Sequence, residues 1–156
     1  MNDELVFCPE EESSGGDSNS RWNILIIDDD VDIHVVTKLA LENVHINGRG
    51  INISHAYSSI DGISHLKKIR DVDLVLLDMV METHDAGLKV ARWLLEEAVR
   101  DGKPIVILRT GHPGLQSTND ILMNPDFNEM IEKSNVTHNS LVSLLTRMLP
   151  GVTLIE

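Results

Sequence analysis

The chain has 156 residues and a formal net charge of −12 at pH 7, which fits a single domain with a hydrophobic core. Its acidity argues against a protein that binds nucleic acid directly, because such affinity rests largely on Lys and Arg. No apolar run approaches the roughly 18–20 residues that a membrane span requires, and the acidic start, Met1–Glu12, is unlike a secretory signal. Cys8 is the only cysteine, so no intramolecular disulfide can form, and we expect a cytoplasmic protein that does not act at a membrane.

Composition divides the chain into three parts. Residues 1–20 are rich in Glu, Ser and Gly and cannot bury enough apolar surface to become ordered, which predicts a flexible acidic leader. We expect one globular domain over residues 21–150. Residues 151–156 would then be a C-terminal tail or the start of a linker.

The first half of the domain alternates strand and helix patterns. Ile24–Ile27 is a continuous run rich in β-branched residues, which favours a strand covered on both faces. A helix is predicted over Val31–Leu41, and a strand with one wetter face over Ile51–Tyr57. Ser58 or Ser59 can then cap a second helix. The inward face of the first helix should contain Val36, Leu39 and Ala40, and that of the second Ile60, Ile63, Leu66 and Ile69.

The second half repeats the same alternation. Leu74–Leu77 and Ile105–Leu108 are two further buried-strand runs, and a long helix is predicted between them over Ala86–Arg100. Glycine and proline interrupt the next stretch, where we expect only a short helix near Thr118–Met123. Phe127–Ile131 could form a final strand, followed by an amphipathic helix with Leu141, Leu144, Leu145 and Met148 on its inner face. Five such units predict a doubly wound α/β fold, a parallel sheet with helices on both faces.

Every buried run of this predicted sheet is followed by a polar residue whose side chain can take part in binding or catalysis. Asp28 and Asp29 leave the first strand, Asp78 ends the third, Thr110 ends the fourth and Lys133 follows the fifth. Ligands of open parallel sheets bind beyond the carboxyl ends of the strands, which is where these residues should meet.

The chemistry of this set fits phosphoryl transfer to a carboxylate. Crowded carboxylates repel unless a cation joins them, and Mg²⁺, which Mn²⁺ could replace, is the natural counter-charge for oxygen ligands. A carboxylate beside such an ion can attack phosphorus, while Lys133 and Thr110 supply a charge and a hydroxyl to the transferring oxygens. Taken singly, the same residues have ordinary explanations: Asp28–Asp30 as a helix N-cap, Thr110 as a turn residue and Lys133 as a surface lysine.

Four segments of the chain resemble the characteristic blocks of response-regulator receiver domains: Ile24–Asp30, Leu74–Asp78, Ile107–Gly111 and Glu129–Ser134. The resemblance covers about Trp22–Leu149. It implies a flavodoxin-like sheet with strand order 2-1-3-4-5, a sensor histidine kinase as phosphodonor, and an output domain or effector protein as the responding partner. It implies a signalling domain rather than an enzyme, capable at most of self-phosphorylation from small donors and of autodephosphorylation.

The resemblance also assigns roles by position. Asp29 would bind Mg²⁺ directly and Asp28 mainly through water. Asp78 would be both phosphoacceptor and metal ligand, and the backbone carbonyl of Val80 would complete the metal site. Thr110 would be the switch hydroxyl, and Lys133 would pair with the phosphate.

A narrower resemblance concerns one receiver subgroup, carried by Asp32–His34, Gly48–Gly50, Met81–Leu88 and Arg109–Gly114. In that subgroup the receiver precedes a sensor-like domain of unknown function and often an HD-GYP cyclic-di-GMP phosphodiesterase. No such output domain is part of this sequence.

Two positions depart from the family pattern. Met130 stands where receivers usually carry an aromatic switch residue, so a ring that toggles between exposed and buried positions is not available. Ser134 replaces the usual proline after Lys133, and a cis bond before a non-proline residue costs about 2.5–4 kcal/mol.

The seven histidines lack tight pairs at helical or hairpin spacing, and we expect ordinary surface or partly buried side chains. His112 is the exception, because it lies two residues after Thr110 and could tune the lifetime of the phosphate. His84 is a weaker second candidate.

Two other classes of protein stay open at this point. A phosphatase or phosphotransferase on a related fold commonly carries an acid/base Asp two residues after its nucleophile, where this chain has Val80. A pseudo-receiver would serve only as an interaction module.

Overall fold

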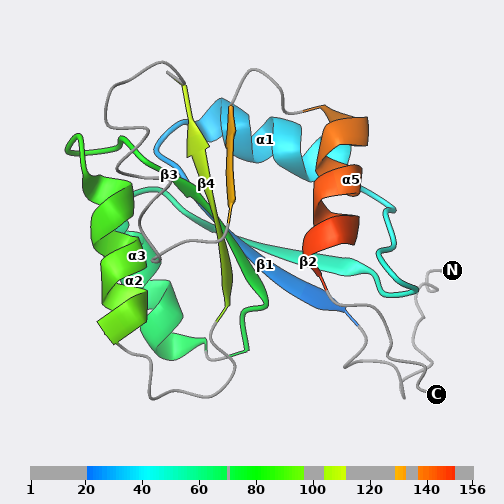
Figure 1. The fold of residues 1–156 in the computed structure, drawn as a ribbon, viewed down its shortest axis with the longest axis horizontal. Coiled ribbons are helices and arrows are strands. Elements are labelled where there is room, and N and C mark those ends of the chain that lie inside the picture. The colour runs from blue at the N-terminus through cyan, green and yellow to red at the C-terminus, as the bar shows by residue number, and fades with distance from the viewer. Residues whose placement is uncertain (1–20, 70, 97–103, 112–128, 133–136, 150–156) are drawn as a thin grey trace, which may run out of the picture.

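The computed structural model describes residues 21–69, 71–96, 104–111, 129–132 and 137–149. They contain a five-stranded sheet in the order β2-β1-β3-β4-β5, with every pair of neighbouring strands parallel (Figure 1). The predicted doubly wound fold and strand order are therefore confirmed. The strands are β1 (Trp22–Ile27), β2 (Ile51–Ala56), β3 (Leu74–Asp78), β4 (Ile105–Thr110) and β5 (Glu129–Glu132).

Helices cover both faces of this sheet. In Figure 1, α1 (Val31–Ala40) and α5 (His138–Met148) lie on one face, while α2 (Ser59–Lys68) and α3 (Ala86–Glu96) lie on the other. The predicted short helix over 118–123, residues 97–100 of the predicted third helix, the leader and the C-terminal tail lie outside the described residues.

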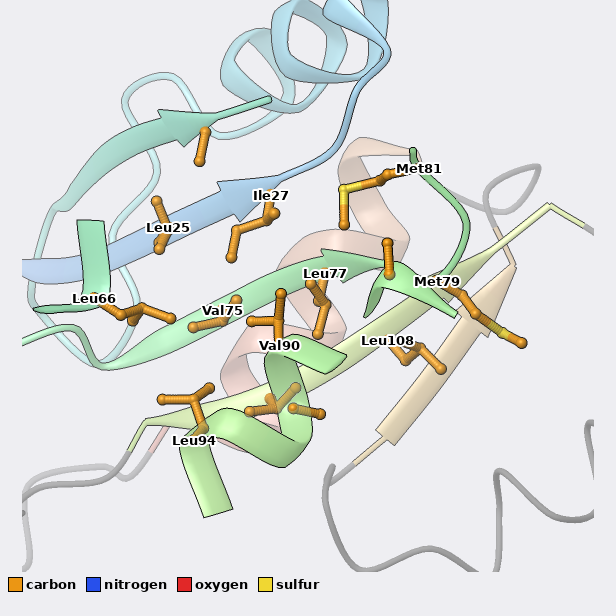
Figure 2. Packing of buried hydrophobic residues seen from close by; sticks show 14 of the residues in the cluster. Leu25, Ile27, Leu66, Val75, Leu77, Met79, Met81, Val90, Leu94 and Leu108 are labelled. Carbon is orange, nitrogen blue, oxygen red and sulfur yellow. The ribbon is translucent and has the colours of Figure 1, made fainter. Parts of the chain in front are cut away.

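Alternation along each strand divides the core into two apolar clusters. Leu25, Val75 and Leu108 point toward α2 and α3, where they pack against Leu66 and Leu94 (Figure 2). The intervening strand residues point to the other face, where α5 covers them. This second cluster includes Ile24, Ile26, Leu74, Leu76, Ile107, Leu141, Leu144 and Leu145.

The predicted inward face of α1 is confirmed at Ala40, which packs against the second cluster, but is wrong at its other two positions. Val36 and Leu39 are 48% and 64% exposed, whereas His34 and Thr37 are 2% and 0% exposed. The physical reason is that this part of the sheet presents polar groups to α1, which must be met by hydrogen-bonding side chains. Helix α2 departs from its predicted face at one position, Ile60, which is 77% exposed.

Candidate functional site

Three carboxylates meet at the carboxyl edge of the sheet. One oxygen from each of Asp28, Asp29 and Asp78 lies within 4.8 Å of the others. Asp28 and Asp78 are buried and Asp29 is exposed. The cap of α1 is a different residue, Asp30, whose side chain accepts a hydrogen bond from the backbone N–H of Asp32. Helix capping therefore does not account for Asp28 and Asp29.

Strand register explains why Asp28 and Asp78 are neighbours. Ile27 of β1 lies opposite Leu77 of β3, so the residue after each of them reaches the same level of the sheet. Asp28 still belongs to the ladder, because its N–H donates to the Ala56 carbonyl at 3.1 Å. Each carboxylate also accepts a hydrogen bond from the backbone N–H of the residue two positions later in the chain. Asp28 accepts from Asp30 at 2.9 Å, and Asp78 accepts from Val80 at 3.3 Å.

This donor set suits a hard divalent cation. Two of the three carboxylates are removed from water, where like charges repel most strongly, and oxygen ligands at close spacing are those that Mg²⁺ and Mn²⁺ prefer. Val80 follows Asp78 by two residues and is partly exposed at the start of the loop. The residues present therefore fit the implied metal.

Thr110 ends β4 and is buried at the same edge. Its strand neighbour in β5 is Glu132, the residue that precedes Lys133 in sequence. Lys133, the bond from Lys133 to Ser134, and His112 lie outside the described residues. Met130 lies in β5 with its backbone opposite Leu108, and its side chain is likewise outside the description.

Arg109 is a site residue that sequence reasoning missed. It is fully buried, it lies opposite Asp78 in the β3–β4 ladder, and its Nη1 donates to Thr37 Oγ1 at 3.1 Å. Burial lowers the pKa of Arg109, and the negative charges of Asp28 and Asp78 oppose that shift. One signal could have indicated this position, namely an arginine at the end of an otherwise apolar strand run.

A histidine pair supports the backbone of Asp28 from the α1 side. His34 Nε2 lies 2.7 Å from the Asp28 carbonyl oxygen, and His34 Nδ1 lies 2.8 Å from His55 Nδ1. Because a carbonyl can only accept, Nε2 of His34 carries a proton, and of the two facing Nδ1 atoms one donates to the other. The Tyr57 ring packs on His34 with 4.3 Å between centroids. His55 is partly buried, as expected, whereas His34 is fully buried, and the contact between them was not predicted from the sequence.

The pKa of His55 is lowered, first by burial and then by the positive charges of His34, Lys38 and His65. Protonation of His55 is thus less favourable in the folded protein than in the unfolded chain. His34 and His55 are 21 residues apart in sequence, and only the packing of α1 on β2 brings them together.

The loop after β3 is tied to α2 through Glu82. Its carboxylate accepts from the Ser59 N–H at 3.2 Å and also from the Ser59 hydroxyl. Burial raises the pKa of Glu82, but the hydrogen bonds from Ser59 outweigh it, so the net shift is downward. This contact fixes the chain four residues beyond Asp78. His84, in the same loop, is exposed.

A flavodoxin-like sheet with a carboxylate cluster at its carboxyl edge is the arrangement expected of a receiver-type signalling domain. The chain belongs to the response regulator receiver domain family, whose model matches residues 24–146. It is therefore a two-component signalling domain and not an enzyme by itself. In the part of the chain that the structure describes, no helix has both the length and the apolar character to cross a membrane.

Relatives and solved structures agree with this assignment. The chain is 30% identical over 132 residues to a 3'3'-cGAMP-specific phosphodiesterase 2 of Vibrio cholerae, covering 85% of this chain but only 25% of that relative. The signal receiver domain of an HD domain-containing protein from Pseudomonas fluorescens is 19% identical with a TM-score of 0.65, covering 83% of this chain and 94% of that one. A receiver domain of a histidine kinase from Clostridium thermocellum is 16% identical with a TM-score of 0.68, covering 82% and 97%. These two structures show that the fold is shared.

Proposed function

We propose that Asp78 accepts a phosphoryl group from a sensor histidine kinase in a Mg²⁺-dependent reaction, and that this modification switches a partner or output domain. The observation that carries the proposal is the meeting of Asp28, Asp29 and Asp78 within 4.8 Å at the carboxyl edge of the sheet. Asp78 is the buried member that ends the central strand of the sheet, where it is paired with Arg109 of β4.

Asp28, Asp29, Asp78 and the Val80 carbonyl would hold the metal, which supplies positive charge to the phosphoryl oxygens when bound. A carboxylate oxygen of Asp78 forms the new bond to phosphorus. The bond from phosphorus to the donor nitrogen of the kinase histidine breaks, and the nitrogen keeps the electron pair.

The remaining residues stabilise the product. The Thr110 hydroxyl donates to a phosphoryl oxygen, and the Lys133 ammonium pairs with another. Met130 would respond to the movement of Thr110 as a flexible side chain, and His112 would influence hydrolysis of the acyl phosphate.

The outer face of α1 supports the kinase as partner. Val31, Val35 and Leu39 are all exposed and follow each other at four-residue spacing, so they form one apolar stripe. The stripe begins two residues after Asp29. A helical partner surface with apolar residues would cover it and bring its phosphohistidine to Asp78.

The relative from Vibrio cholerae supports the narrower subgroup. That protein is a 3'3'-cGAMP-specific phosphodiesterase by name, and the match with this chain covers a quarter of its length. We infer that the receiver, residues 21–150, acts in the cytoplasm ahead of an output of that kind. Residues 1–20 would form its acidic leader.

Incubation with a small phosphodonor and Mg²⁺, followed by intact-protein mass spectrometry, tests the proposal. The wild-type chain should gain one phosphoryl group, and removal of Mg²⁺ by a chelator should prevent the gain. Asp78→Asn should abolish labelling, while Asp85→Asn, an exposed acid in the next loop, should not. Unchanged labelling of Asp78→Asn would contradict the assignment.

A further inference from the structure

Arg109 is a buried cation on the same face of the sheet as the two buried carboxylates, Asp28 and Asp78. Ile26, Leu76 and Ile107 all point into the cluster under α5. Side chains alternate along strands, so the residues two places later, Asp28, Asp78 and Arg109, point to that same face. The register of β3 and β4 sets Asp78 directly opposite Arg109.

Most donors of this guanidinium have no hydrogen-bond partner in the part of the chain that the structure describes. Nη1 donates to Thr37, but Nε and Nη2 are buried without a hydrogen-bond partner, and among the described residues Arg109 forms no ion pair. A buried cation with unsatisfied donors is costly unless nearby negative charge compensates it. The compensating charges are Asp28 and Asp78.

We propose that Arg109 is a second cation of the phosphoacceptor site, which balances Asp28 and Asp78 before the metal binds and then donates through Nε and Nη2 to the phosphorylated Asp78. The proposal rests on the proposed function of Asp78. Phosphorylation replaces a carboxylate with a group that carries more negative charge and more acceptor oxygens. The fork of an arginine matches such oxygens.

Two opposite effects follow from this role. In the unmodified protein Arg109 repels a divalent cation, so its neutralisation should strengthen Mg²⁺ binding. In the modified protein Arg109 attracts the phosphoryl group, so its neutralisation should weaken binding of beryllofluoride, a mimic of that group. A residue needed only for folding would weaken both when it is replaced.

The experiment is titration of Mg²⁺ alone, and then of beryllofluoride at saturating Mg²⁺, by calorimetry. We compare the full chain with Arg109→Met, Arg109→Gln and Arg109→Lys, and use Arg92→Met, an exposed arginine of α3, as control. Arg109→Gln keeps a donor for Thr37 if Arg109→Met fails to fold. Circular dichroism and thermal unfolding report folding of each variant.

We expect Arg109→Met and Arg109→Gln to bind Mg²⁺ several-fold more tightly and beryllofluoride about tenfold or more weakly, from the usual strength of a charge-assisted hydrogen bond. Arg109→Lys should lie between these and the wild type, and Arg92→Met should match the wild type. Beryllofluoride binding within twofold of the wild type, or weakening of both ligands together, would overturn the proposal. Absence of beryllofluoride binding in the wild type would instead overturn the function proposed for Asp78.

Discussion

Gly87, near the start of α3, packs directly against the backbone of Asp78. Its N–H donates to the Met79 carbonyl at 2.9 Å. A Cβ at this position would lie 2.7 Å from the Met79 Cα and 3.0 Å from the Asp78 carbonyl carbon. Backbone cannot yield as a flexible side chain can, so only glycine allows α3 to approach the end of β3 this closely.

Gly87→Ala should therefore displace the backbone of Asp78. We expect a loss of about 1–3 kcal/mol in the free energy of unfolding, which is typical of an overpacked site, together with slower phosphorylation. Gly111→Ala is the matched control, because a Cβ there meets nothing within 4 Å. Urea denaturation and the rate of labelling measure the two effects. Equal stability of the two variants would show that the Gly87 contact is not restrictive.

The Glu82–Ser59 contact predicts a pH-dependent contribution to stability. Because the pKa of Glu82 is lowered from its usual 4.5, its carboxylate stabilises the folded protein above about that pH. The contribution is lost as the pH falls through the folded-state pKa. Glu82→Gln should flatten the stability profile in this range, and Ser59→Ala should do the same. If the free energy of unfolding of both variants changes with pH as that of the wild type does, the contact is refuted.

The His34–His55 pair predicts sensitivity at milder acidity. The pKa of His55 is lowered from 6.5 in the folded protein, so the unfolded chain takes up the proton first as the pH falls. Stability should therefore decline below about pH 6.5. His55→Asn should remove part of this decline, whereas replacement of exposed His45 by Asn should not. Urea unfolding at a series of pH values checks this, and an unaltered profile in His55→Asn would count against the pairing.

The apolar stripe on α1 can be tested separately from the chemistry at Asp78. Leu39→Lys and Val35→Lys change exposed side chains, so the free energy of unfolding should change by less than about 0.5 kcal/mol. Phosphotransfer from a sensor kinase that labels the wild type should slow at least tenfold, while labelling by a small donor is retained. Ile60→Lys, which changes a still more exposed side chain on α2, is the control. If Leu39→Lys accepts phosphate from the kinase at the wild-type rate, α1 is not the docking surface.

Several parts of this molecule could be predicted from the sequence because they depend on local pattern. The apolar runs Ile24–Ile27, Leu74–Leu77 and Ile105–Leu108 are short and rich in β-branched residues, which favours strands covered on both faces. Parallel strands end at one edge, so Asp28 and Asp78 had to meet once those strands were paired.

Other features depend on which segments pack together, and pattern alone does not give that. Arg109 and Thr37 are 72 residues apart, and the buried polar side of α1 meets the guanidinium of β4 through Thr37 and the Asp28 carbonyl through His34. A hydrophobic pattern assigns Val36 and Leu39 to the core, because it carries no information about the hydrogen bond that Thr37 accepts from Arg109. The roles of Lys133, His112 and Met130 remain predictions from the family pattern.

The central claim is that Asp78 becomes an acyl phosphate. Reduction of the phosphorylated wild-type chain with borohydride converts an acyl phosphate into an alcohol, so the modified aspartate is found as homoserine by peptide sequencing in the mass spectrometer. The account predicts homoserine at position 78 and unmodified aspartate at positions 28 and 29. Homoserine at either of those positions, or phosphate on a hydroxyl residue with Asp78 intact, would contradict it.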